Sequence, residues 1–392
     1  MAQNTPSGES LHLAFFGLRN AGKSSLVNAV TGQSVSITSA VKGTTTDPVR
    51  KSMELLPLGP VVIIDTPGLD DEGELGALRV ERTRRILDET DLAVLVTDCT
   101  CPLTADELAL MATLTQRKIP HILVKNKADL LAERPDFDGL YVSARTGEGV
   151  RALKEALAKL AACPCQEKRI VADLLSPGDH VVLITPIDAS APKGRLILPQ
   201  QQTIRDILEA GCCCTITQPE QYPAVLKAMQ TPPRLVITDS QVFGKVDAMT
   251  PPDVPLTSFS ILFARYKGEL NSMVQGAAVL DSLRDGDRVL ISEGCTHHRQ
   301  CGDIGTVKLP AWIRKHTGVK PDFHFTSGGE FPADLSSFAL VIHCGGCMLN
   351  GAEMKSRLVR AASQGIPMTN YGMAIAKLHG ILERSMAPLQ SR

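Results

Sequence analysis

Residues 17–24, GLRNAGKS, constrain the fold of this chain more than any other segment, because they match the phosphate-binding pattern GxxxxGKS in full. The apolar run LHLAFF precedes them and the helical stretch SSLVNAVTG follows, which is the order of strand, loop and helix that a P-loop requires. Glycines let the loop curl so that backbone amides and the helix N-terminus face the phosphates of a nucleotide. The predicted nucleotide-binding residues here are Gly17, Asn20, Ala21, Gly22, Lys23, Ser24 and Ser25.

Two side chains of this loop have predicted chemical roles. Lys23 is expected to reach the β- and γ-phosphates, and the hydroxyl of Ser24 is expected to bind Mg²⁺. A second Mg²⁺ anchor is predicted where the strand VVIID ends in DTPG, since the Asp65 carboxylate can hold the ion and the Gly68 amide can sense the γ-phosphate. Between them lies the polar segment GTTTD at 43–47, in which one threonine could complete the Mg²⁺ shell.

Base recognition separates GTP from ATP, and the sequence favours GTP. The strand HILVK leads into Asn126, Lys127, Ala128 and Asp129, the pattern NKxD, whose aspartate can accept two hydrogen bonds from guanine N1 and N2. Further along, Ser143 and Ala144 are expected to supply a backbone amide for the guanine oxygen. These elements come in the right order and at strand ends, so the predicted ligands are GTP and Mg²⁺.

The chain predicts an α/β fold throughout, with a P-loop GTPase domain followed by two smaller α/β domains with mainly parallel sheets. Short apolar runs alternate with amphipathic helical stretches, the order of a parallel sheet covered by helices. The predicted divisions are a GTPase domain at 11–161, a linker at 162–177, a middle domain at 178–255 ended by the prolines of TPPDVP, and a third domain at 256–392. Residues 258–283 predict one long helix.

The GTPase motifs resemble the translation-factor-like GTPases, in particular the branch related to the tRNA-modification and ribosome-assembly GTPases. That resemblance implies that Thr45 is the magnesium threonine and that Asn20 marks hydrolysis stimulated by K⁺. Lys23, Thr45 and Gly68 are therefore the expected catalytic set. The residue after DTPG is Leu69, where many GTPases have a water-orienting glutamine, so slow intrinsic turnover is expected.

Cysteine and histidine gather at two strand ends in the third domain. The strand RVLISE leads to Cys295, His297 and His298, and the strand FALVIH leads to His343, Cys344 and Cys347. Ligands bind outside the carboxyl ends of parallel strands, so these two remote segments are expected to converge on one metal or cluster. Two alternatives remain open at this point: a structural zinc site with two cysteine and two histidine ligands, and inert thiols in a core.

The spacing Cys295-x-His297, then His343-Cys344-x-x-Cys347, behind a GTPase and a middle domain, resembles the GTPases that mature FeFe hydrogenase. The resemblance implies a 4Fe-4S cluster on Cys295, Cys344 and Cys347, with His297 or His343 as possible fourth ligand; His298 also stays open. It further implies a scaffold that receives a two-iron precursor from radical-SAM maturases and delivers it to apo FeFe hydrogenase, and a homodimer formed through the middle domain.

Composition names no other partner. The 41 basic and 42 acidic residues balance, so neither nucleic acid nor a membrane is expected to bind by bulk charge, and a cytoplasmic location is expected from the polar first ten residues. The rival function is an RNA- or ribosome-associated GTPase with a structural zinc site. The remaining cysteines, Cys99, Cys101, Cys163, Cys165, Cys212, Cys213, Cys214 and Cys301, are interpreted as incidental or as small buried residues.

Overall fold

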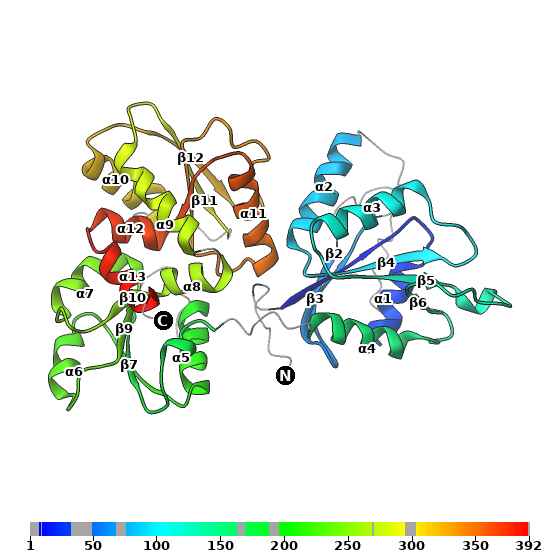
Figure 1. The fold of residues 1–392 in the computed structure, drawn as a ribbon, viewed down its shortest axis with the longest axis horizontal. Coiled ribbons are helices and arrows are strands. Elements are labelled where there is room, and N and C mark those ends of the chain that lie inside the picture. Colours follow the sequence, from blue (N-terminus) through cyan, green and yellow to red (C-terminus); the bar gives the residue numbers. More distant parts are fainter. Residues whose placement is uncertain are drawn as a thin grey trace. The chain divides into compact units, whose positions relative to one another are not determined.

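The computed structural model describes residues 8, 10–32, 49–67, 76–162, 169–187, 196–268, 270–294 and 303–390. The chain divides into two compact units near residue 166 (Figure 1). Among the site residues predicted above, Thr45, Gly68, Cys295 and His297 lie outside the described residues. No helix in the described part of the chain is long and apolar enough to span a lipid bilayer.

The first unit is built on a six-stranded sheet with the order β2-β3-β1-β4-β5-β6. Only β2 runs antiparallel to its neighbour. The central strands β1 and β4 are mostly apolar and are buried on both faces, as expected for the middle of a covered parallel sheet. The strands are β1 Leu11–Phe16, β2 Val49–Leu55, β3 Gly59–Asp65, β4 Leu92–Asp98, β5 His121–Asn126 and β6 Leu140–Tyr141.

Helices cover both faces of this sheet, so the predicted α/β fold with a mainly parallel sheet is confirmed for this unit. Helices α1 Lys23–Thr31 and α4 Val150–Ala161 pack on one face, and α2 Gly76–Glu89 and α3 Ala105–Gln116 pack on the other (Figure 1). Two apolar clusters, one on each face, form the core of the unit. The carboxyl ends of β1, β3 and β5 therefore open on the same edge, where Gly17, Asp65 and Asn126 are brought together.

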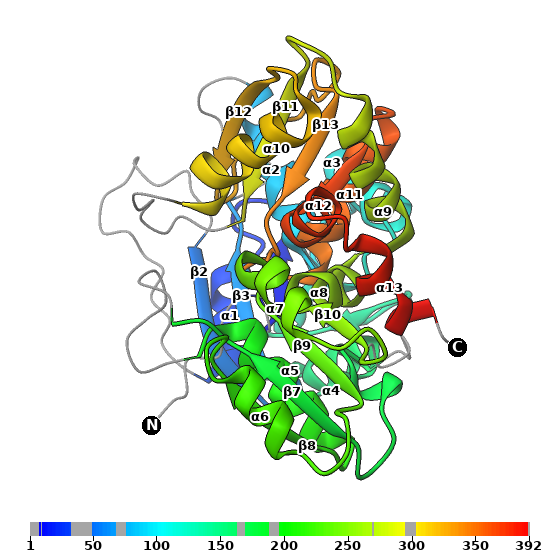
Figure 2. The same cartoon turned by 90° about the vertical axis from the view of Figure 1, so that its left-hand side faces the viewer.

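The second unit contains two four-stranded parallel sheets, as predicted (Figure 2). The first has the order β10-β9-β7-β8, with β7 His180–Ile184, β8 Cys213–Thr217, β9 Leu235–Thr238 and β10 Leu256–Ser258. The second has the order β12-β11-β13-β14, with β11 Arg288–Glu293, β12 Asp322–Ser327, β13 Leu340–His343 and β14 Met368–Asn370. The helices are α5 Leu198–Glu209, α6 Tyr222–Ala228, α7 Phe243–Met249, α8 Phe259–Lys267, α9 Leu270–Ala278, α10 Leu309–Thr317, α11 Gly351–Ser363, α12 Tyr371–Leu378 and α13 Leu382–Gln390.

Two predictions about this unit were wrong. The long helix at 258–283 is two helices, α8 and α9, because α8 ends at Lys267 and Gly268 adopts an extended conformation. The first sheet of this unit, which belongs to the predicted middle domain and is called the middle sheet below, also continues past residue 255. Its strand β10 pairs in parallel with β9. The prolines of TPPDVP flank this short edge strand instead of ending a domain, and an edge strand tolerates proline at its start.

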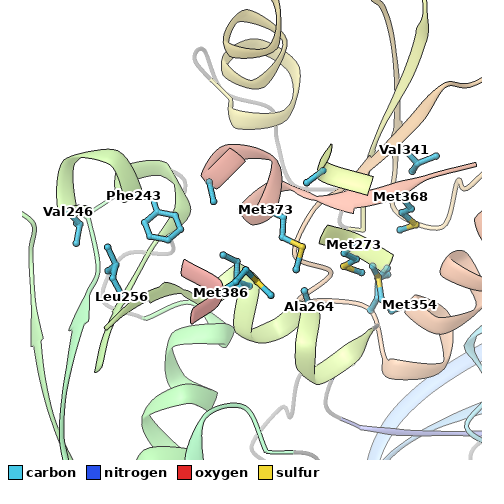
Figure 3. Packing of buried hydrophobic residues seen from close by; sticks show 14 of the residues in the cluster. Phe243, Val246, Leu256, Ala264, Met273, Val341, Met354, Met368, Met373 and Met386 are labelled. Atoms are coloured by element: carbon cyan, nitrogen blue, oxygen red, sulfur yellow. The ribbon is translucent and has the colours of Figure 1, made fainter. Parts of the chain in front are cut away.

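One apolar cluster joins the two sheets of the second unit, which explains why they form a single compact body. Figure 3 shows Phe243 and Leu256 on the side of the first sheet, and Met273 and Met368 on the side of the second. Methionine is frequent in this cluster, and its flexible thioether fills irregular gaps between elements that meet at different angles.

Gly276 in α9 gives a test of this packing. A Cβ placed on Gly276 would lie 2.1 Å from the carbonyl oxygen of Met368 in β14, so the helix backbone lies directly against the strand. Gly276→Ala is expected to destabilise the second unit by about 2–4 kcal/mol through overpacking, measured as a lower urea midpoint in circular dichroism. The control is Gln275→Ala, an exposed position of the same helix. Equal midpoints for the two variants would show that the helix can move away from β14 at little cost.

Candidate functional site

The P-loop has a backbone that only small or permissive residues can adopt. Gly17 has φ +150°, and a Cβ there would lie 2.1 Å from the carbonyl oxygen of Val96. Gly22 has φ +87°, and a Cβ there would lie 2.3 Å from Nδ2 of Asn126. Asn20 is one of the few non-glycine residues with a left-handed backbone, at φ +63°. The glycines of the motif are thus required by close backbone approach, and this holds the loop around the start of α1.

Lys23 lies at the N-terminus of α1 and is folded back along the loop. Its side chain is 8 % exposed, and its Nζ donates to the carbonyl oxygens of Gly17 at 2.9 Å and Leu18 at 2.8 Å. The N-cap of α1 is Gly22, which has no side chain to cap the first-turn amides. A helix start of this kind presents backbone N–H groups and a positive dipole end, which suits a phosphate.

The two predicted Mg²⁺ side chains are in contact. The Ser24 hydroxyl donates to Oδ2 of Asp65 at 2.8 Å. Oδ1 of Asp65 is buried and has no hydrogen-bond partner within the described residues. Burial raises the pKa of Asp65, only partly offset by the Ser24 hydroxyl and the Lys23 charge. An orphaned buried carboxylate oxygen beside a hydroxyl fits a hard cation, which would hold Asp65 ionised.

Asn126 connects the loops that would surround a nucleotide. Its Nδ2 donates to the carbonyl oxygen of Ala21 at 2.9 Å, and its Oδ1 accepts from the amide of Ala144 at 3.0 Å. This side chain therefore holds the P-loop and the Ser143-Ala144 turn together from the end of β5. The sequence predicted a backbone amide of Ser143 or Ala144 for the guanine oxygen, and of these the Ala144 amide bonds Asn126 here.

Asp129 is oriented by the turn that follows β6. Its Oδ1 accepts from the hydroxyl of the fully buried Ser143 at 2.6 Å, and its Oδ2 lies 3.8 Å from Nε of Arg145. The Ser143 hydrogen bond holds the pKa of Asp129 below its usual range, so the carboxylate is anionic. A fixed carboxylate at this position can accept from the N1 and N2 hydrogens of guanine, which adenine does not offer.

Sequence reasoning predicted Lys127 but missed the two residues that hold it, Asp98 and Cys99. Lys127 has a left-handed backbone at φ +64°, and its Nζ lies 2.6 Å from Oδ2 of Asp98 at the end of β4. The thiol of Cys99 donates to the carbonyl oxygen of Lys127 at 3.1 Å. Cys99 was interpreted as incidental, but it lies directly behind the NKAD segment. The only sequence signal was the position of Asp98 and Cys99 at the end of the neighbouring strand.

The cysteine motif lies at the carboxyl edge of the second sheet in the second unit. Strands β11 and β13 are parallel neighbours, with Ser292 opposite His343. The amide of Gly294 donates to Sγ of Cys344 at 3.0 Å, and the amide of Cys344 donates to the carbonyl oxygen of Ser292 at 2.9 Å. Gly294 directly precedes Cys295, so the described end of the β11 segment contacts the Cys344 loop.

Backbone amides surround the first sulfur of this loop, and the second thiol is partly buried. Sγ of Cys344 also accepts from the amide of Gly346, at 3.4 Å. Gly346 has φ +60°, which turns the chain between the two cysteines. Burial and the nearby Cys344 raise the pKa of Cys347. Amides that donate to sulfur and a partly buried second thiol suit an iron-sulfur cluster or a thiolate-bound metal, which would ionise both cysteines.

His343 is a poor candidate for the fourth ligand, contrary to one of the predicted options. The ring is 0 % exposed, with Nδ1 2.8 Å from the carbonyl oxygen of Cys344 and Nε2 2.9 Å from Nη1 of Arg357. A guanidinium only donates, so Nε2 must accept and Nδ1 must carry the hydrogen. Both nitrogens are therefore occupied by the protein. His297, the other option, lies outside the described residues, as does Cys295, and no group of three metal-binding side chains occurs within the described ones.

The three adjacent cysteines of the middle sheet differ from one another. Cys212 is buried and its thiol donates to the carbonyl oxygen of Ser176 at 3.0 Å, as expected for a small core residue. Cys213 is exposed and Cys214 is half-buried, both on the edge strand β8. The interpretation as small buried residues therefore holds for Cys212 and fails for Cys213.

Three family models match this chain. Residues 12–127 match the 50S ribosome-binding GTPase model, residues 170–268 match the hydrogen maturase F dimerization domain, and residues 271–388 match the hydrogen maturase F tetramerization domain. The two maturase models meet at residues 268–271, where α8 gives way to α9. Together they cover more than half of the chain.

Curated relatives include tRNA modification GTPases that match part of this chain. The tRNA modification GTPase MnmE of Laribacter hongkongensis is 37 % identical over 156 residues, covering 38 % of this chain and 34 % of that protein. The corresponding protein of Xylella fastidiosa is 41 % identical over 159 residues, covering 39 % and 34 %. The chain thus spans about a third of the length of these relatives.

Solved structures similar to part of this chain include a G domain and an Era protein. The G domain of the T. maritima FeoB iron transporter is 24 % identical, with a TM-score of 0.32, over 39 % of this chain and 99 % of that chain. Era from Aquifex aeolicus is 20 % identical, with a TM-score of 0.34, over 56 % of this chain and 98 % of that chain.

Proposed function

Because the chain belongs to the hydrogen maturase F family of GTPases, we propose that it hydrolyses GTP and carries an iron-sulfur cluster during the maturation of FeFe hydrogenase. The observation that carries this proposal is the hydrogen bond of 3.0 Å from the Gly294 amide to Sγ of Cys344. It brings the residue before Cys295 to the first sulfur of the Cys344-x-x-Cys347 loop, although 50 residues separate the two in the chain.

The proposed cluster is a 4Fe-4S centre held by Cys295, Cys344 and Cys347. A cluster bound by three thiolates keeps one iron open to an exchangeable donor, which suits a protein that receives and releases another metal fragment. In this arrangement the amides of Gly294 and Gly346 stabilise the charge on Cys344. His297 or an exchangeable ligand fills the fourth position, since Arg357 and Cys344 already occupy the nitrogens of His343.

The nucleotide site performs the other half of the function. Lys23 turns from its carbonyl partners to the β- and γ-phosphates, Ser24 and Asp65 hold Mg²⁺, and Asp129 selects guanine. Thr45 completes the Mg²⁺ shell, Gly68 senses the γ-phosphate, and Asn20 binds K⁺. With Leu69 after the DTPG motif, no side chain at that position orients water, so intrinsic turnover is slow.

The partners of this function are a two-iron precursor from radical-SAM maturases and apo FeFe hydrogenase, which receives it. The chain assembles with copies of itself through residues 170–268 and 271–388, the segments that match the dimerization and tetramerization models. The alternative is an RNA- or ribosome-associated GTPase with structural zinc. Its RNA or ribosome part is supported by the GTPase model over residues 12–127 and by MnmE relatives that cover 38 % of the chain.

Anaerobic purification followed by iron, sulfide and zinc analysis tests the proposal. The expected result is a brown protein with about four irons and four sulfides per chain, bound with the absorption of a 4Fe-4S cluster. A colourless protein with one zinc per chain would support the rival function. A protein without metal after reconstitution with iron and sulfide would leave a GTPase with inert cysteines.

A further inference from the structure

Lys267 is a buried cation next to the cysteine loop. It is the last residue of α8 and is 7 % exposed. Its Nζ donates to the carbonyl oxygen of Gly346 at 3.1 Å and to that of Leu349 at 2.7 Å. Burying an ammonium group is costly unless it is well bonded, so a lysine held here indicates a specific purpose for its charge or its contacts.

The two acceptors of Lys267 lie on either side of Cys347. Gly346 directly precedes this cysteine, and its carbonyl oxygen also accepts from the amide of Leu349 at 3.1 Å. Gly346 has a left-handed backbone, and a Cβ there would lie 3.3 Å from Sδ of Met354, a member of the apolar cluster in Figure 3. One ammonium group therefore closes the turn that presents the Cys347 thiol.

The same turn also contacts the Cys295 segment. A Cβ placed on Gly294 would lie 2.8 Å from Cγ of Leu349, so this leucine packs directly on the residue before Cys295. A shift of the 346–349 turn would therefore move Cys347 and disturb the position from which Cys295 leaves β11. Lys267 takes part in both effects. It bonds the carbonyl oxygen of Gly346, which precedes Cys347, and the carbonyl oxygen of Leu349, which packs on Gly294.

A second buried cation holds the other end of the loop. Arg357 in α11 is 2 % exposed, donates through Nη2 to the carbonyl oxygen of Gly328 at 2.8 Å, and bonds His343 through Nη1. The loop thus has a guanidinium at its start and an ammonium at its turn. In a poorly solvated environment these charges favour an anionic occupant, because Coulomb interactions strengthen as the effective dielectric falls.

We propose that Lys267 is a positioning residue for the cluster, closing the turn around Cys347 and supplying a positive charge that favours the reduced, more negative state of the bound cluster. This inference rests on the proposed function, since it assumes a cluster on Cys344 and Cys347. It assigns two separable effects to one side chain, namely retention of iron through the two hydrogen bonds and a higher reduction potential through the charge.

Two substitutions separate these effects. Lys267→Met removes both the charge and the donors, whereas Lys267→Gln removes the charge and keeps an N–H donor. The matched control is Lys355→Met, which removes the same charge from an exposed position in α11 of the same unit. Each full-length variant is reconstituted anaerobically with iron and sulfide. The reduction potential is followed by electron paramagnetic resonance, and iron loss is followed with a ferrous chelator.

Both Lys267 variants are expected to have a more negative potential, by about tenfold in the reduction equilibrium constant or about 59 mV for one electron. Only Lys267→Met is expected to release iron about tenfold faster. Lys355→Met should match the wild type in both measurements. An unchanged potential in both Lys267 variants overturns the role of the charge, and unchanged iron release in Lys267→Met overturns the positioning role.

Failure of the proposed function itself looks different, because the wild type would then take up no cluster. If Lys267→Met does not fold, which circular dichroism of the metal-free protein reports, Lys267→Gln still tests the potential. Lys267→Gln is then compared with Lys267→Arg, which keeps the charge and several donors, and Lys267→Gln is expected to have the more negative potential. Equal potentials in these two variants would overturn the role of the charge.

Discussion

Replacing Asp129 with asparagine is expected to weaken GTP binding by roughly 10²–10⁴-fold, because one hydrogen bond to guanine is lost and the other loses its charged acceptor, at about 1.5–3 kcal/mol each. The carboxylate is held for this task by the Ser143 hydroxyl at 2.6 Å, which also lowers its pKa. An asparagine can keep the Ser143 hydrogen bond, so the change removes the charge and one acceptor without disturbing the turn. Titration with a fluorescent GTP analogue measures the effect.

The same substitution should change specificity as well as affinity. Xanthine has a carbonyl group where guanine has its 2-amino group, so an asparagine amide can donate to it while its oxygen accepts from N1. Asp129→Asn is therefore expected to prefer xanthosine triphosphate over GTP. Asp138→Asn, an exposed position before β6, is the matched control and should leave both affinities unchanged. GTP affinity that survives in Asp129→Asn would place base recognition elsewhere.

Much of the nucleotide site could be predicted because its parts are local and their order in the chain matches their order at the sheet edge. The GxxxxGKS, DTPG and NKAD segments each follow a strand, and parallel strands end at the same edge. The role of Asn126 could not be predicted in this way. Its contact with Ala21 joins residues 105 apart, and it depends on the distance between the ends of β1 and β5.

The second unit was harder because its signals are short or ambiguous. Strand β10 has three residues, too few for a pattern, and the apolar spacing of residues 258–283 is the same for one helix as for two. Only Gly268 marked the break. The hydrogen bonds of His343 could not be predicted from the sequence either. Its partner Arg357 is one of many basic residues, and the two side chains meet only in the fold, where α11 packs beside β13.

Substitution of Cys344 by alanine is expected to reduce iron from about four per chain to less than about a tenth of that after anaerobic reconstitution, since a 4Fe-4S cluster needs its thiolate ligands. The β11 segment contacts the loop after β13 at Sγ of Cys344, which accepts hydrogen bonds from the amides of Gly294 and Gly346. Its loss therefore removes a ligand and the point at which β11 and the loop after β13 are joined. Iron, sulfide and visible absorption report the outcome.

Cys212→Ala provides the matched control, because Cys212 is a buried thiol of the same unit that bonds the carbonyl oxygen of Ser176, before β7. It should keep its full iron content. The GTPase rate of Cys344→Ala without iron should equal that of the metal-free wild type, since every nucleotide-site residue argued above belongs to the first unit. If Cys344→Ala retained four irons, the cluster would have to be held by other cysteines. The contact between Gly294 and Cys344 would then be a feature of the folded sheet, with no bearing on metal.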